Sequence, residues 1–151
     1  MVDYIFLQIL IASIAATSAM ALFSYIISKS FRELYKEPVL LTFILSKLNL
    51  DLSIKTKTIL AWLLHYFIGL IFVIIYHILW FYNILKLSLL SALLLGAVSG
   101  IIGIISWMFM FKITEHKPQI DYKGYYIQLF FAHIIFGITA ALVYCFLQQS
   151  S

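Results

Sequence analysis

The chain has 151 residues, of which 64% are hydrophobic and 11% are charged, and its formal net charge is +4. Soluble domains are about 45–50% apolar and about 25% charged, so the composition excludes an ordinary soluble domain and indicates one membrane domain over residues 1–151. The basic residues flank apolar stretches, which argues against nucleic-acid binding, and the single Cys145 excludes an internal disulfide and a cysteine-based zinc site.

The first apolar stretch, residues 4–28, is long enough to cross a bilayer. A helix rises about 1.5 Å per residue and the hydrocarbon core is about 30 Å thick. The middle of this stretch, around Ala16, consists almost entirely of small residues. Small residues let helix backbones approach closely in lipid, where association depends on van der Waals contact. We therefore expect this helix at the centre of a bundle.

The connection over residues 29–57 holds six of the ten basic residues and one short apolar run. Glu37 and Pro38 open this run, and an acid followed by proline is typical of a helix start. The run, residues 38–48, is too short to span a membrane. We expect an interfacial helix lying on the membrane, with a helix packed under the bundle as the alternative.

Three further apolar stretches, residues 58–82, 87–111 and 125–147, complete a predicted all-α, four-helix integral membrane bundle. In the third span, small residues recur at intervals of three and four and share one face: Ala92, Gly96, Ser99, Gly100, Gly103 and Ser106. Gly96 and Gly100 form the small-x-x-x-small pattern of close helix contact. We expect this face to pack closely against the first span.

The distribution of basic residues predicts the orientation. Nine of the ten Lys and Arg fall in residues 29–57 and 112–124, and only Lys86 falls on the opposite side. The positive-inside rule therefore places those two loops in the cytoplasm and both termini outside. Aromatic residues agree, with Trp107 at the predicted inner interface and Trp80 at the outer one.

An internal repeat is also indicated. A shift of 68 positions aligns one pattern in the second span with the same pattern in the last: His65, Gly69 and Tyr76 with His133, Gly137 and Tyr144. A shift of 82 positions aligns small residues of 17–25 with those of 99–107. Equivalent helices run in the same direction, so the predicted arrangement is two parallel-repeated helical hairpins.

Three short sequences carry a resemblance to known proteins. Ala15-Ala16-Thr17 in the first span, Glu37-Pro38 before the short apolar run, and the stretch 132–137 (Ala-His-Ile-Ile-Phe-Gly) resemble a group of small bacterial four-helix membrane proteins. That group is classed only as domains of unknown function. The resemblance supports the four-helix architecture and a multi-pass protein of the bacterial cytoplasmic (inner) membrane, and it implies no activity.

Histidine is the only acid or base inside a predicted span, so the carboxylate relays of ion-coupled transporters are absent and we expect no enzyme. His65 lies eight residues past Lys57, and His133 lies ten past Lys123. Both are therefore predicted about 12–15 Å into the cytoplasmic half. A glycine follows each histidine one turn later, Gly69 and Gly137, and either packs against another helix or leaves room for a flat ring.

The histidine pair has two interpretations. In the structural one, which we favour, each imidazole hydrogen-bonds a hydroxyl of the bundle, such as that of Thr17, Ser99 or Ser106. In the other, His65 and His133 approach each other and together ligate a haem or a metal. Of the remaining histidines, we expect His77 at the outer interface and His116 in a solvated loop.

Three functions follow as hypotheses. We favour a non-enzymatic structural or accessory subunit without a cofactor, whose partners are the lipid bilayer and other membrane-protein subunits or further copies of itself. The second is electron transfer by a bis-histidine haem or metal protein that uses His65 and His133. The third is a carrier of an apolar or lipid-like molecule, for which we expect oligomerisation because four helices enclose little volume.

Overall fold

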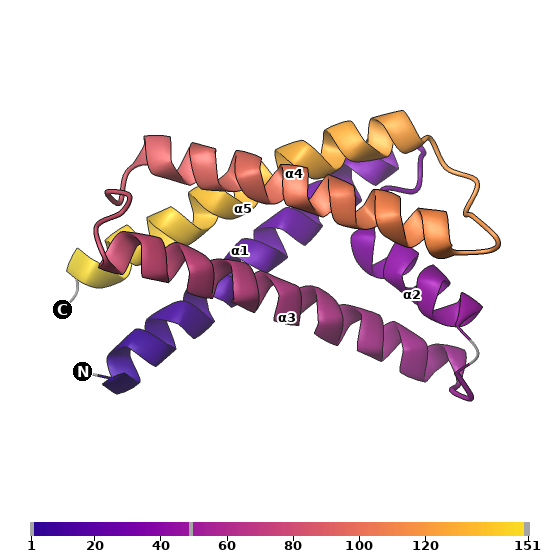
Figure 1. Ribbon diagram of the computed structural model, residues 1–151, viewed down its shortest axis with the longest axis horizontal. Coiled ribbons are helices and arrows are strands. Elements are labelled where there is room, and N and C mark those ends of the chain that lie inside the picture. Colours follow the sequence, from indigo (N-terminus) through magenta and orange to yellow (C-terminus); the bar gives the residue numbers. More distant parts are fainter. Residues whose placement is uncertain (1, 49, 150–151) are drawn as a thin grey trace.

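The computed structural model describes residues 2–48 and 50–149, so that Met1, Asn49, Ser150 and Ser151 lie outside the described residues. Over the described residues it contains five helices: α1 (Val2–Phe31), α2 (Glu37–Lys47), α3 (Ile54–Phe81), α4 (Leu89–Ile113) and α5 (Tyr122–Gln149) (Figure 1). Four of them, α1, α3, α4 and α5, are long and apolar enough to cross a membrane. The predicted all-α architecture with four potential spans is therefore confirmed.

Local polar groups set where the long helices begin and end. The Ser53 hydroxyl accepts a hydrogen bond from the Thr56 backbone N–H at the start of α3. Ser88 and Ser91 cap each other's backbone N–H groups at the start of α4. Between these helices, Asn83 has a φ of 54°, a left-handed conformation that asparagine adopts more readily than most residues. One potential span therefore ends and the next begins within residues 82–88.

The helix α5 is the central element of the bundle. It packs along both α1 and α4, whereas α3 packs against α1 and α2. The predicted close contact between the first and third spans is wrong, because α1 and α4 each pack on α5 instead of on one another. A stripe of small residues shows that some helix approaches closely, and it does not specify which helix.

The small residues of α4 show how close this approach is. A Cβ atom added to Gly96 would lie 2.7 Å from the backbone oxygen of His133, and one added to Gly100 would lie 3.0 Å from the ring of Phe130. Ser99 lies beside α3, where its hydroxyl is 2.6 Å from that of Tyr76. In α1, Ala16 is fully buried. Gly96, Ser99 and Gly100 therefore lie at helix contacts, whereas Ser106 of the same face is exposed.

The short helix α2 lies at one end of the bundle, and one of its faces is buried (Figure 1). The buried residues are Glu37, Pro38, Leu40, Leu41 and Ile44, and the helix packs against α3. These contacts correspond to the second alternative derived from the sequence, a helix packed under the bundle. As a result, the carboxyl group of Glu37 is buried in the interior of the bundle.

Candidate functional site

A cavity of about 240 Å³ lies among the helices, and all five of them contribute to its wall. Most of the wall is apolar and comes from Met20, Leu41, Ile68, Phe72, Trp107, Met110 and Phe136. A few polar side chains share it: Thr17, Glu37, His65, Ser106 and His133. A largely apolar cavity with a few convergent polar groups is the usual form of a small-molecule site.

Glu37 is the one carboxyl group among the residues that line this cavity, and it is 1% exposed. Its Oε1 accepts a hydrogen bond from the Ser24 hydroxyl at 2.7 Å and a longer one from the Gln128 amide at 3.5 Å. Gln128 also donates to the Ser24 oxygen at 2.5 Å, so the three side chains form one network. The second carboxyl oxygen, Oε2, is buried and has no hydrogen-bond partner.

The surroundings of Glu37 favour its neutral form. Burial raises the pKa of the carboxyl group to about 7, because it disfavours the charge, although the hydrogen bonds from Ser24 and Gln128 oppose the shift. Oε1 already accepts these hydrogen bonds, so the proton of the neutral acid belongs on Oε2. Near neutral pH this cavity-lining group is therefore poised between a hydrogen-bond donor and a negative charge.

The tautomer of His133 follows from its hydrogen bond. Its Nδ1 lies 2.9 Å from the backbone oxygen of Leu129. A carbonyl oxygen can only accept, so Nδ1 carries the proton and Nε2 of the neutral ring carries a lone pair. Gly103 makes room for the ring, because a Cβ there would lie 2.8 Å from the His133 Cε1 atom. The rings of His133 and Phe72 also pack against each other in an edge-on arrangement, with 5.9 Å between their centroids.

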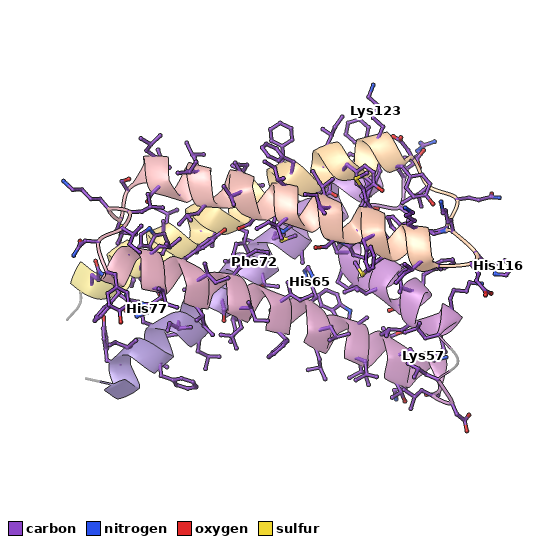
Figure 2. The ribbon with its side chains drawn as sticks, viewed as in Figure 1. Lys57, His65, Phe72, His77, His116 and Lys123 are labelled. Carbon is purple, nitrogen blue, oxygen red and sulfur yellow. The ribbon has the colours of Figure 1, made fainter. Side chains whose placement is uncertain are left out.

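His65 enters the same cavity from α3 and is 7% exposed. Its ring lies 6.3 Å from those of Trp62 and Tyr66, and its Nε2 atom is buried without a hydrogen-bond partner. In Figure 2, His65 lies near the middle of the molecule and His77 lies at the opposite end from Lys57. His65 and His133 therefore line one common cavity, and His77 stands apart from it.

The predicted hydrogen bonds between these imidazoles and hydroxyl groups are wrong for the described residues. His133 donates to a backbone carbonyl, and the Thr17 hydroxyl is buried and unpartnered. Ser99 pairs with Tyr76, and Ser106 donates to the carbonyl of Ile102 one turn earlier in its own helix. A serine inside a helix readily bonds its own backbone, which removes it as a partner for histidine.

The glycines that follow the histidines serve helix contacts. A Cβ on Gly137 would lie 2.5 Å from the Ala92 backbone oxygen, and one on Gly69 would lie 2.0 Å from the Thr17 hydroxyl oxygen. Among the described residues, no group of three or more His, Cys, Asp or Glu side chains is placed to hold a metal ion. Ligation of a haem by His65 and His133 stays a prediction.

The other two histidines lie outside the cavity wall. His77 is half-buried, and its ring stacks on Phe81 at 5.6 Å and lies 5.8 Å from the ring of Tyr144. His116 is exposed in the loop between α4 and α5, as the sequence predicts (Figure 2).

Sequence reasoning found the two histidines and missed Glu37. The pair Glu37-Pro38 indicated only a helix start, because it lies outside every predicted span. The available signal was its position directly before an apolar run, which places a carboxyl group beside a buried helix face. No protein family, curated protein or solved structure matches this chain.

Proposed function

We propose that this protein is a non-enzymatic membrane protein that binds and carries an amphipathic, lipid-like molecule in the cavity. The observation that carries the proposal is the combination of an apolar wall with buried polar atoms that lack partners, namely Glu37 Oε2, His65 Nε2 and Thr17 Oγ1. A buried polar group without a partner costs about 1–3 kcal/mol. A ligand whose polar end reached these atoms would remove part of that cost.

The position of the cavity supports entry of the ligand from the lipid. Two lining residues, Ile68 of α3 and Ser106 of α4, are exposed, and both lie within potential membrane spans. The backbones of α3 and α4 come close at few points, although a short loop joins the helices and the side chains of Tyr76 and Trp80 form hydrogen bonds with α4 (Figure 1). With residues 29–57 and 112–124 on the cytoplasmic side, as we also propose, the cavity lies in the cytoplasmic half of the membrane.

A carrier explains more of the structure than the two other hypotheses. An accessory subunit would account for the exposed apolar faces, but lipid covers such faces equally well, and the unpartnered polar atoms would have no role. A haem, a large flat ring system, is bulky for this cavity of about 240 Å³. One alkyl chain with a small polar end suits it better. The cavity belongs to one chain, so the carrier hypothesis does not require oligomerisation.

The experiment is calorimetric titration of the full chain in lipid nanodiscs with three ten-carbon probes: decylammonium, decanol and decanoate. Ile68→Trp fills the exposed side of the cavity, and Ile75→Trp is its matched control. The two isoleucines are 44% and 45% exposed on the same helix, and Ile75 does not line the cavity. We expect at least one probe to bind the wild type and Ile75→Trp, and to bind Ile68→Trp at least tenfold more weakly.

Two results would contradict the proposal. Equal binding by Ile68→Trp and Ile75→Trp would place the probe elsewhere on the protein or in the lipid. A haem absorption band in the visible spectrum of the purified protein, lost in His65→Phe and His133→Phe, would favour the electron-transfer hypothesis instead.

A further inference from the structure

We infer that the cavity selects a hydrophobic organic cation, such as a long-chain amine, and that this cation replaces the proton of Glu37. This inference rests on the proposed function, since it names the chemical class of the molecule that the cavity carries. Three features of the cavity support it: the balance of charge, the excess of acceptor atoms, and the aromatic wall.

The charge balance disfavours an anionic ligand. The cavity wall contains three titratable side chains, Glu37, His65 and His133, and no lysine or arginine. The α4 lining residues include no titratable group, and the other titratable groups that interact with the carboxyl group are the phenols of Tyr25 on α1 and Tyr125 on α5. A phosphate or carboxylate would therefore enter an apolar site beside an acid and without a lysine or arginine to pair with, which is costly.

Lys36, the residue before Glu37, lies outside the cavity wall. Its ammonium group lies over the Tyr25 ring instead, 4.7 Å from the ring centre. The only lysine next to Glu37 in the sequence is thus engaged on an aromatic face. The buried carboxyl group has no ion-pair partner of its own among the described residues of the wall.

The free polar atoms match an ammonium group. When Glu37 is ionised, its Oε2 atom is an acceptor without a partner, and the neutral His133 offers the lone pair of Nε2. An ammonium group carries three N–H donors and no acceptor. The aromatic residues Phe72, Trp107 and Phe136 also line the cavity, and aromatic rings attract cations. A metal ion does not fit as well, because no group of three ligands is assembled among the described residues.

Binding of the cation is coupled to loss of one proton. The protonated Glu37 and the incoming ammonium ion give a carboxylate–ammonium pair and one proton, which leaves to water, so charge and atoms balance. An opposite charge within a few ångströms lowers the pKa of a carboxyl group, and conversely a proton on Glu37 weakens the hold on the cation. Because burial raises the pKa of Glu37 to about 7, the exchange takes place across neutral pH.

The test uses the same nanodisc titration with decylammonium, repeated in buffers of different ionisation enthalpy, which gives the number of protons released. For one group with a pKa of about 7, we expect release of about 0.9 proton at pH 6 and about 0.1 at pH 8. The affinity for decylammonium should rise about tenfold over the same interval. Decanol should bind more weakly and release no proton, and decanoate should bind weakest.

Glu37→Gln isolates the carboxyl group, because glutamine keeps an oxygen for the hydrogen bond from Ser24. We expect this variant to lose at least tenfold in affinity for decylammonium, to release no proton, and to bind decanol as the wild type does. The control is Glu33→Gln, at an exposed acid outside the cavity wall, which should behave as the wild type.

The outcomes separate the two proposals. Decanol binding as tightly as decylammonium, or proton release that persists in Glu37→Gln, would overturn the cation inference and leave the carrier proposal intact. If none of the three probes binds the wild type more tightly than it binds Ile68→Trp, the carrier proposal itself fails. If Glu37→Gln does not fold, the protons released by the wild type at the two pH values decide the question alone.

Discussion

Replacing Gly137 by alanine tests the close contact between α4 and α5. The added Cβ would lie 2.5 Å from the backbone oxygen of Ala92 and 3.0 Å from the Cα and N atoms of Gly96. Ordinary van der Waals contact begins at 3.4 Å, so the carbonyl oxygen must move away by about 0.9 Å. All three obstacles are main-chain atoms, so a side-chain rotation cannot relieve the overlap, and the two helices must separate.

The magnitude follows from two opposing terms. Alanine is a better helix former than glycine by about 1 kcal/mol, which on its own would stabilise α5. Separation of packed surfaces by about 0.5–1 Å removes a quarter to a half of their dispersion energy, and overpacking of a tight contact costs about 1–3 kcal/mol. The contact involves two helices along much of their length, so we expect the packing loss to exceed the gain in propensity. The expected net destabilisation is up to about 2 kcal/mol.

The assay is reversible unfolding of the full chain in mixed micelles, followed by circular dichroism. Ile101→Leu is the control, because Ile101 is exposed on α4 and the substitution conserves volume; it should change the unfolding free energy by less than about 0.5 kcal/mol. Adding Ala92→Gly to Gly137→Ala should not rescue stability, since the obstacle is the carbonyl oxygen of residue 92. A Gly137→Ala protein as stable as the wild type would refute the packing argument.

Three further predictions concern other parts of the chain. In a cysteine-free background, a cysteine at Lys86 should react with a membrane-impermeant reagent in intact cells and one at Lys117 should not; the reverse pattern would invert the proposed orientation. The unfolding free energy should fall by about 1.4 kcal/mol per pH unit from about pH 4.5 to about pH 7. Over this interval the unfolded chain loses the Glu37 proton, whereas the folded state keeps it up to a pKa of about 7. A denaturation series at different pH values should show no such fall in Glu37→Gln. Gly69→Ala should destabilise the bundle by about 1–3 kcal/mol, because the added Cβ would lie 2.0 Å from the Thr17 hydroxyl oxygen. Adding Thr17→Ala should restore most of that loss, and a double-mutant cycle with a coupling energy near zero would contradict the predicted contact.

The site itself was only partly predictable. The matched patterns around His65 and His133 pointed to a shared region, and both side chains line one cavity. Glu37 was missed because sequence rules assess an acid by the hydropathy of its own segment, and this segment is too short to span. Its hydrogen-bond partners, Ser24 and Gln128, are 13 and 91 positions away in the chain. A local sequence pattern does not predict contacts between residues so far apart in the chain.

The sequence by itself determined which segments are long, apolar helices, and the predicted spans begin and end within four residues of the observed helices. A segment that crosses lipid must be long and apolar by itself, so hydropathy was sufficient for that prediction, whereas the serine caps at the starts of α3 and α4 were recognised only in the structure. Only the tertiary structure decided which helices pair. Several helices carry similar stripes of small residues, and shape complementarity between whole surfaces chose α5, rather than α1, as the partner of Gly96 and Gly100. The same packing folds α2 under the bundle, and that arrangement turns a helix-starting glutamate into a buried acid.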